Sequence, residues 1–389
     1  MTLAATQTVV RRWQKKLFVK PETAFDTFDD ASSALGTAEA LDNESFEAGI
    51  TRPKNEDNSN TGTAGRPKPT EGRDDGSWSY DVAMRPSGAA GTPPQEHQLL
   101  FALFGDYVNA GGTSDTYSFD STVKRCLTLF EDDGDIAQIH KGALINSGKL
   151  SFDGAGNVAW EFEGKHATTL LSGTDALNGA ITDVATNMTV DDASKYDEGT
   201  RILIEAEIVL VGTIDYGSNV IQITRGHSGT SNVAHSDNVA VTGLKPSHAL
   251  IGAKIVRPVT LTLDDGEGAT AVDIISGFFM VDKKLKEFND ETGTVKMTGG
   301  EYDVKKVSLE ITMRLYRDQL YLLNGINRDL SFAGVLQIGN TAGRTATVTM
   351  PTLVGLKAPI EEGDNEVIVT RTFEAFENAG DDEATFVFT

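Results

Sequence analysis

Most of the chain alternates hydrophobic and polar residues with a period of two, which is the pattern of half-buried β-strands. The clearest example is KVSLEITMRL, in which polar residues separate Val307, Leu309, Ile311, Met313 and Leu315. Comparable runs predict strands at residues 13–20, 77–85, 259–263, 331–339, 345–350, 366–374 and 383–388. The pattern therefore predicts a mainly β fold whose strands bury one face and expose the other.

A β-hairpin is predicted at the centre of the chain, in KLSFDGAGNVAWEFEGK (149–165). A glycine-rich turn separates two alternating runs there, which is a strong short-range hairpin signal. The apolar positions of the two strands are Leu150, Phe152, Val158, Trp160 and Phe162.

Two short stretches depart from the period of two and predict helices. In TPPQEHQLLFALFG (92–105), we expect Thr92 to be the N-cap and Gln95 to complete a capping box. Gly105 supplies the C-terminal stop. The apolar face of this helix comprises Leu99, Leu100, Leu103 and Phe104. A second short helix is predicted for RDQLYLLNG (317–325).

The strand pattern divides the chain into a body and an insertion. Residues 170–245 contain several short strands separated by glycine and Asp/Asn clusters, which predicts an inserted all-β module of roughly 75 residues. Residues 1–169 and 246–389 would then form one β-sandwich-like or barrel-like body with one or two flanking helices. Within the first segment, residues 37–76 are polar and predict a long loop or arm, and one that orders on a neighbouring subunit would explain its length.

The chain is strongly acidic, with a formal net charge of −23. Proteins that grip DNA by its phosphates need clustered Lys and Arg, so this charge disfavours DNA binding. The single cysteine, Cys126, excludes an intramolecular disulfide and is expected to be a small buried apolar side chain. The most apolar run, 202–212, is too short to span a membrane and contains two glutamates, and the Arg11-Arg12 pair is not followed by the apolar stretch of a signal peptide.

The stretch ITRGHSGTSNVAH (223–235) is the strongest candidate for chemistry. A serine nucleophile at Ser228 would need Gly-x-Ser-x-Gly on a strand-to-helix turn, but the fifth position is Thr230 and no helical pattern follows. A metal site on His227 and His235, with Asp237 nearby, lacks anything that makes the ligands converge. A turn shaped by small residues is therefore the favoured interpretation.

The other candidates for catalysis or ligand binding are weaker. The acidic turns at 130–136 and 263–269 do not follow the EF-hand pattern and are expected to be solvated hairpin tips. The remaining histidines are scattered, and they are His97, His140, His166 and His248. A phosphate-binding glycine loop is also missing. The sequence therefore predicts no catalytic, cofactor or metal site, and a protein that is not an enzyme.

Several stretches, taken in order, resemble the tail tube (major tail) proteins of long-tailed bacteriophages. They are LFVKPETAFDTFDD (17–30), YDVAMRPSGAAGTPPQEHQLLFALFG (80–105), ALINSGKLSFDGAGNVAWEFEG (143–164) and VTMPTLVGLKAPIEEGDNEVIVTRTFEAF (348–376). Residues 170–245 resemble a small β module found inserted in phage virion proteins. In that setting Arg225, Gly226, Gly229 and His235 look like turn-shaping residues.

The resemblance implies a virion structural protein, made in the host bacterial cytoplasm, whose copies form stacked hexameric rings around a lumen. In the family each subunit contributes one sheet to an inner β-barrel, while the helix and any inserted module lie outside. The implied partners are other copies of the chain, the tape measure protein, and the tail-end and neck proteins. Double-stranded DNA would pass through without specific contacts, no membrane is involved, and a non-contractile tail is the expected type.

The role of the acidic residues and the class of function both stay open. The acidic residues either line the lumen and repel DNA phosphates, or simply keep an abundant subunit soluble. A different class of function is a β-rich adhesion or carbohydrate-binding module on the virion surface. Clustered exposed Trp or Tyr residues would favour adhesion, but the three tryptophans are dispersed at Trp13, Trp78 and Trp160.

Overall fold

The computed structural model describes most of the chain. The described residues are 15–28, 35, 39–42, 45–55, 68–154, 156, 158–255, 258–266, 268–288, 296–314, 316, 324–325, 328, 330–356, 361–362 and 367–389. In this part of the chain the fold is mainly β, as predicted, with one α-helix, α1 (His97–Phe104), and no helix long and apolar enough to cross a membrane.

The body is built on an antiparallel sheet of seven strands, called the long sheet. Its order is β3 (Ser45–Thr51), β6 (Asp75–Ala83), β11 (Ala159–His166), β10 (Ala137–Asp153), β21 (Ile274–Asp282), β24 (Lys306–Arg314) and β28 (Val367–Ala375). The predicted central hairpin is the β10–β11 pair, and KVSLEITMR forms β24.

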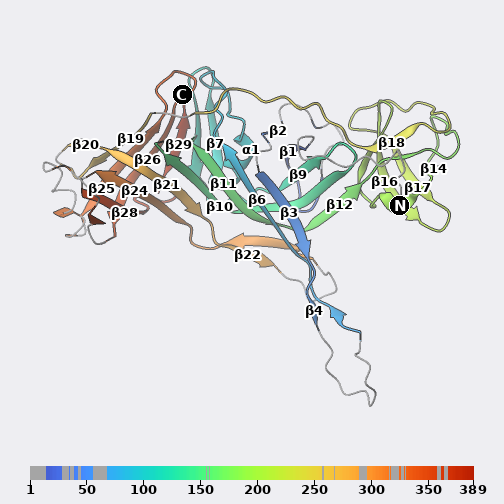
Figure 1. Cartoon of the computed structure of the whole chain (residues 1–389), viewed down its shortest axis with the longest axis horizontal. Coiled ribbons are helices and arrows are strands. Elements are labelled where there is room, and N and C mark those ends of the chain that lie inside the picture. The colour runs from blue at the N-terminus through green and yellow to red at the C-terminus, as the bar shows by residue number, and fades with distance from the viewer. Residues whose placement is uncertain are drawn as a thin grey trace, which may run out of the picture.

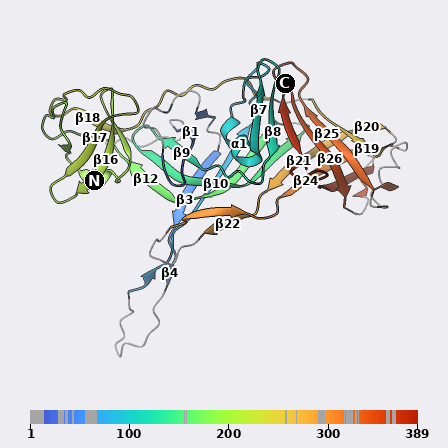
Figure 2. The ribbon, with the colours of Figure 1, turned by 180° about the vertical axis from the view of Figure 1, so that it is seen from behind.

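A second sheet completes a half-barrel around the core (Figures 1 and 2). Its order is β20 (Ala269–Val272), β19 (Val259–Asp264), β25 (Ser331–Ile338), β26 (Ala346–Gly355), β29 (Thr385–Phe388), β8 (Ser114–Phe119) and β7 (Gly105–Ala110). The end of β26 also pairs with β28, so this strand joins the two sheets, while β27 (Glu361–Glu362) pairs with the start of β28.

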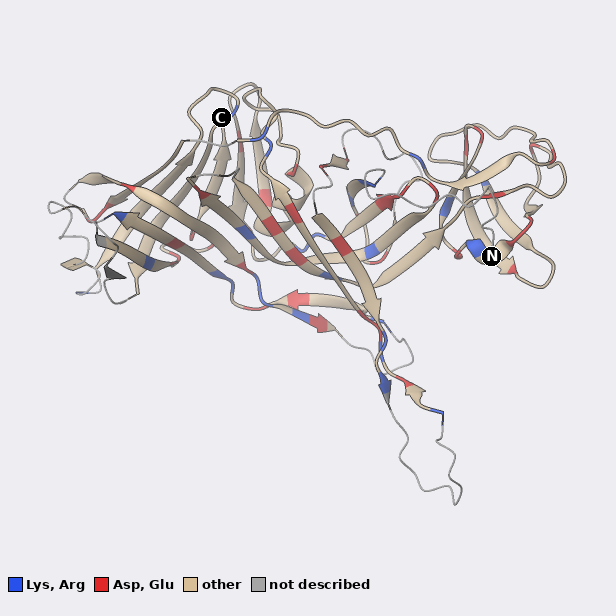
Figure 3. Cartoon of the chain, viewed as in Figure 1, with Lys and Arg blue, Asp and Glu red and all other residues tan. Residues whose placement is uncertain are grey.

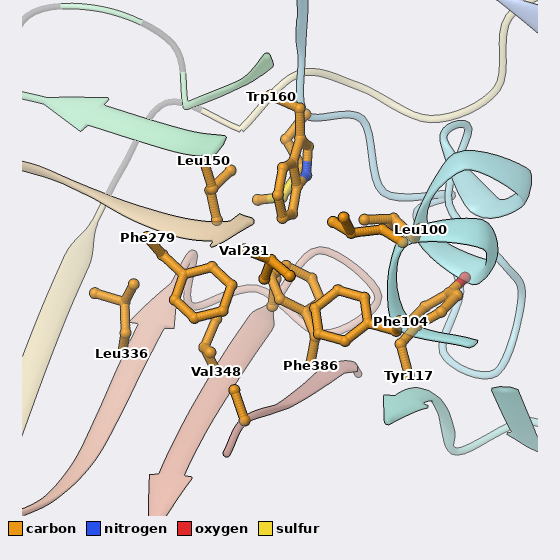
Figure 4. Close-up of a cluster of buried hydrophobic side chains, with 14 of the residues drawn as sticks. Leu100, Phe104, Tyr117, Leu150, Trp160, Phe279, Val281, Leu336, Val348 and Phe386 are labelled. Atoms are coloured by element: carbon orange, nitrogen blue, oxygen red, sulfur yellow. The ribbon is translucent and has the colours of Figure 1, made fainter. Parts of the chain in front are cut away.

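The core of the body fills the space between the two sheets. Trp160 and Phe279 from the long sheet lie opposite Val348 and Phe386 from the second sheet, and α1 closes one side with Phe104 (Figure 4). All five side chains are almost completely buried. Large aromatic side chains contribute most to such a core, since each removes a large apolar area from water.

A third group of strands extends the body toward the inserted module. Its order is β2 (Ala40–Leu41), β1 (Lys16–Pro21), β9 (Leu127–Asp132), the first half of β10, and β12 (Thr168–Ser172). Strand β10 therefore belongs to two sheets. It changes direction where its register shifts, near Gly142, whose φ of +65° favours glycine.

The module has a sheet and a core of its own. Its strands, in order, are β13 (Asp175–Ala176), β18 (Ala240–Gly243), β15 (Arg201–Ile204), β16 (Glu207–Asp215), β17 (Val220–His227) and β14 (Asn187–Thr189). A short 3-10 helix, η2 (Ala193–Lys195), lies beside them. The most apolar run, 202–212, is part of a hairpin, because Glu205 adopts a φ of +54° and turns the chain.

The module is packed against the body rather than tethered to it. Ile208 of the module lies in one buried cluster with Phe18 and Phe130 of the body. The Arg201 guanidinium lies over the Phe28 ring, 4.9 Å from its centroid. Gly243 is so close to Ala137 that an added Cβ would lie 2.6 Å from the alanine Cβ.

The predicted arm is a β-hairpin rather than a loop. Strands β3 and β6 continue past the body, and β4 (Lys54–Asn55) pairs with β5 (Thr70–Glu71) beyond them. The hairpin projects away from the body in Figure 1. The polar sequence concealed these strands because the arm buries little surface, so its pairing depends on backbone hydrogen bonds and not on an apolar stripe. Residues 56–67 lie outside the described part.

Helix α1 begins later than predicted, and the capping box does not form. The N-cap is Glu96, without a side-chain capping hydrogen bond, and Gly105 ends the helix with a φ of +102°. Gln95 is used elsewhere: its side-chain amide donates to the Ala40 carbonyl, and its Oε1 accepts from Ile251 N at 2.6 Å. The second predicted helix, 317–325, lies almost entirely outside the described residues.

Strands β22 (Leu285–Phe288) and β23 (Gly299–Tyr302) form a separate hairpin below the long sheet. Glu287 of β22 forms ion pairs with Arg73 and with Lys165, whose Nζ lies 3.5 Å from Glu287 Oε1. Lys165 also contacts Asp75 Oδ1 at 2.7 Å. These charges fix the root of the arm against the body.

Glu96 generates the first testable prediction. Its side chain is fully buried at the start of α1, and burial raises its pKa to about 8. The folded state therefore holds a proton that the unfolded chain releases near pH 4.5, so stability is lost as the pH rises toward 8. Glu96→Gln should remove this loss, which amounts to up to about 5 kcal/mol across the interval.

Urea unfolding of both proteins between pH 5 and about pH 8.5 checks this expectation. The difference in unfolding free energy between Glu96→Gln and the unaltered chain should grow with pH. Parallel pH profiles would show that Glu96 is ionised in the folded protein. Buried histidines affect both proteins equally, so the difference isolates Glu96.

Candidate functional site

The candidate stretch 223–235 is organised by a buried glutamate, Glu207. Arg225 donates to both Glu207 carboxylate oxygens, at 2.7 and 2.6 Å, and His235 Nε2 lies 2.9 Å from Glu207 Oε2. The backbone amides of Gly226 and Val233 donate to the same carboxylate. Burial alone would raise the pKa of Glu207, but these hydrogen bonds lower it to about 2.

The histidines and the serine of this stretch have structural surroundings. His235 Nδ1 faces Glu205 Oε2 at 2.8 Å, so both ring nitrogens of His235 lie against carboxylates. Ser228 is buried and adopts a φ of +54°, and Gly226 and Gly229 also have positive φ. The geometry is that of a tight turn, and among the described residues no cluster of potential ligands is arranged to hold a metal ion.

The acidic turn at 130–136 differs from the prediction of a solvated tip. Glu131, Asp132 and Asp133 are buried, because β9 is flanked by β1 and β10 rather than lying at an edge. Lys15 Nζ lies 2.6 Å from Glu131, and Lys16 Nζ lies 3.2 Å from Asp132. In the other acidic turn, 263–269, Asp264 accepts from the amide of Gly266 at 2.8 Å and shapes an exposed turn.

The remaining histidines are also held by neighbouring groups. His140 Nδ1 and His166 Nε2 both lie 2.9 Å from Thr169 Oγ1, His97 Nδ1 lies 2.8 Å from Tyr117 Oη, and His248 contacts the Leu41 carbonyl. Burial lowers the pKa of His140, of His166 and of His97. Cys126 is half-buried, and burial raises the pKa of its thiol to about 11, so a reactive thiolate is disfavoured.

The outward face of the long sheet is the most extended polar feature of the body. One row of cross-strand neighbours runs over every strand of the sheet: Ser45, Asp81, Glu161, Lys149, Met280, Ser308 and Glu374. The next row contains Glu47, Ser79, Glu163, Ser147, Asp282 and Lys306. We call this surface the polar face.

Acidic residues outnumber basic residues on the polar face, as Figure 3 shows along its strands. The acidic residues are Glu47, Asp75, Asp81, Asp153, Glu161, Glu163, Asp282, Glu310 and Glu374. The basic residues are Lys149, Lys165, Lys306 and Arg314. They follow from strand alternation, because the intervening residues enter the core.

The carboxylates of the polar face are close enough to repel one another. Partial burial raises the pKa of Asp81, and the negative charges of Glu161 and Glu47 raise it further against the opposing effect of Lys149. Lys149 Nζ lies 3.0 Å from Glu161 Oε2 and offsets part of this repulsion. Near β3, Glu47, Ser79, Glu163 and other residues line a hollow of about 580 Å³.

Sequence reasoning missed Glu207 and the polar face for different reasons. Glu207 is separated from Arg225 and His235 along the chain. The β16–β17 ladder brings Arg225 beside it, and His235 reaches it from the segment after β17, where it forms a bridge with Ile181. The polar face was visible strand by strand as alternation, but the strand order that assembles it was not.

No known protein-family model matches the chain, and no curated protein matches it. The likeness to tail tube proteins therefore stays a prediction from the quoted stretches.

A substitution of Glu207 tests its role in the module. Glu207→Gln leaves Arg225 buried without its full charge partner, so we expect a loss of about 3–5 kcal/mol in unfolding free energy of the module. Ser228→Ala should preserve the Glu207 cluster, because the hydrogen bonds described above for that carboxylate come from other residues. Chemical denaturation followed by hydrogen exchange of residues 175–243 measures the unfolding free energy of the module in both variants. Equal losses in the two variants would show that Glu207 does not organise this stretch.

Proposed function

We propose that this chain is a structural subunit of a phage tail tube, whose copies join sideways into rings and stack around a DNA passage. The observation that carries the proposal is the polar face of the long sheet, which is continuous across the sheet and predominantly acidic. A surface of this kind suits the wall of a DNA passage, because negative charge repels phosphates while clustered Lys and Arg would hold them.

The edge of the long sheet supports sideways joining. Strand β3 forms a ladder with β6, and within the described residues no strand is paired with its other edge. An unpaired edge is a liability for an isolated protein, and pairing it with another copy removes that liability. Ile50 lies on this strand with 37% of its surface exposed, which suits a contact with a neighbour.

The arm supports contact along the direction of stacking. Its hairpin projects beyond the body in Figure 1, and ion pairs at its root hold it there. A projecting, polar hairpin buries little surface in one copy and is suited to a neighbouring one. In this arrangement the module lies on the outer surface, away from the polar face.

The alternative, a carbohydrate-binding or adhesion module, gains no support from the aromatic residues. Such sites present exposed aromatic rings, but Trp78 and Trp160 are buried in the core, and Trp13 lies outside the described residues. Tyr216 and Tyr316 are exposed but belong to different parts, the module and the body.

Electron microscopy of the purified chain over a range of concentrations tests the proposal. We expect rings or tubes of uniform bore for the unaltered chain. Ile50→Lys places a charge beside the β3 edge and should leave monomers, since buried unpaired charge is costly at an interface. Val184→Lys, at a module position that is 79% exposed, is the matched control and should assemble normally. Monomers of the unaltered chain at every concentration would refute the proposal.

Charge reversal tests the polar face separately. Glu47→Lys with Glu163→Lys adds positive charge to this face, and Asp183→Lys with Asp191→Lys makes the same change on the module. We expect the first pair to bind double-stranded DNA at low salt at least about tenfold more tightly than the second. Retention of DNA fragments at increasing salt measures this; equal retention by both pairs would show that the polar face does not meet DNA.

A further inference from the structure

We propose that a cleft beside the C-terminal end of α1 binds a carboxylate group attached to an apolar body, with the Lys283 ammonium as its partner. The cleft adjoins the polar face at Lys306 and Glu374 and is distinct from the Glu207 cluster. It has a volume of about 720 Å³ and lies among the ends of α1, β21, β24 and β28 and the loop at residues 376–383.

Lys283 is an unusual group to find in the wall of a cleft. Its side chain is buried, its Nζ donates to the Ala102 carbonyl at 3.1 Å, and it lies 3.9 Å from the Tyr302 ring centroid. An ammonium has three N–H donors, so these contacts leave hydrogen-bonding capacity. Among the described residues no carboxylate forms an ion pair with Lys283. A buried cation without a counter-ion is costly, and a bound carboxylate would offset that cost.

Three acidic residues of the cleft wall, Glu374, Asp381 and Glu383, are paired with other lysines. Lys305 lies 3.1 Å from Glu383 and also pairs with Asp381. Lys306 pairs with Glu374 in the same wall. Burial lowers the pKa of Lys283 to about 7, and the positive charge of Lys305 adds to this effect. These three carboxylates therefore do not neutralise the Lys283 ammonium.

The rim of the cleft supplies the apolar part of the site. Phe376 and Val304 line it and are exposed, Val304 to 79%. Both walls also contain a non-glycine residue with left-handed backbone, Lys284 at a φ of +49° and Asp381 at +52°. Backbone conformations of this kind cost free energy and cluster at binding sites. A ligand with a carboxylate and an apolar group fits these surroundings.

Two sources present this chemistry, a small carboxylate and an acidic side chain of a second copy. Competitive acetylation with acetic anhydride, read for each lysine by mass spectrometry, separates them. At pH 7 about half of the Lys283 amine is free, against fewer than about one in a thousand for an ordinary lysine. We therefore expect Lys283 to label much faster than Lys284, its neighbour at the rim.

The first arm adds benzoate to the dilute chain, with uncharged benzamide as the matched control. A carboxylate raises the pKa of a paired lysine by about 1–3 units, so benzoate should slow Lys283 labelling at least about tenfold while Lys284 is unchanged. The second arm omits benzoate and uses concentrated, self-associated chain. Protection in the first arm identifies a small carboxylate, and protection in the second alone identifies a second copy.

Three results would overturn the proposal. They are slow labelling of Lys283 in the dilute chain at every pH, unchanged labelling in both arms, and equal protection by benzamide and benzoate. Because the first arm uses unassociated chain, its outcome does not depend on whether the protein forms tubes.

Discussion

The alternation of side chains along the strands of the long sheet is the constraint on which the rest of the body depends. Each strand sends its apolar residues, such as Phe279 and Leu309, into the core and leaves the others outside. A one-residue slip in any ladder would exchange these two sets. The same register that packs the core therefore brings carboxylates from separate strands together on one surface, where they repel one another and other anions.

Much of the architecture could be predicted because its strands and turns follow from patterns within short stretches of sequence. The alternation at residues 307–313 identified β24, and the central glycine-rich turn identified the β10–β11 hairpin. The features that sequence could not supply are tertiary. Gln95 matched a capping box, yet its amide is used by Ala40 and Ile251, which local reasoning cannot place beside it.

The candidate site illustrates the same limit in electrostatic terms. The acids at 131–133 match a solvated turn in sequence, but their strand lies between two others and brings Lys15 and Lys16 against them. Arg225 and His235 were identified as turn-shaping residues, but the carboxylate that makes them so, Glu207, belongs to the neighbouring strand. A buried charged residue needs a partner of opposite charge, and the order of the strands determines which partner lies beside it.

Gly243 packs closely against Ala137, and the Arg201 guanidinium lies over the Phe28 ring. These two contacts oppose rotation of the module relative to the body. The module therefore rotates together with the body. A probe attached to the outer end of the module would turn with the body through the same angle, and would magnify a small rotation into a large displacement. The orientation of the module relative to the body therefore depends on Gly243, because a Cβ at this position would clash with Ala137.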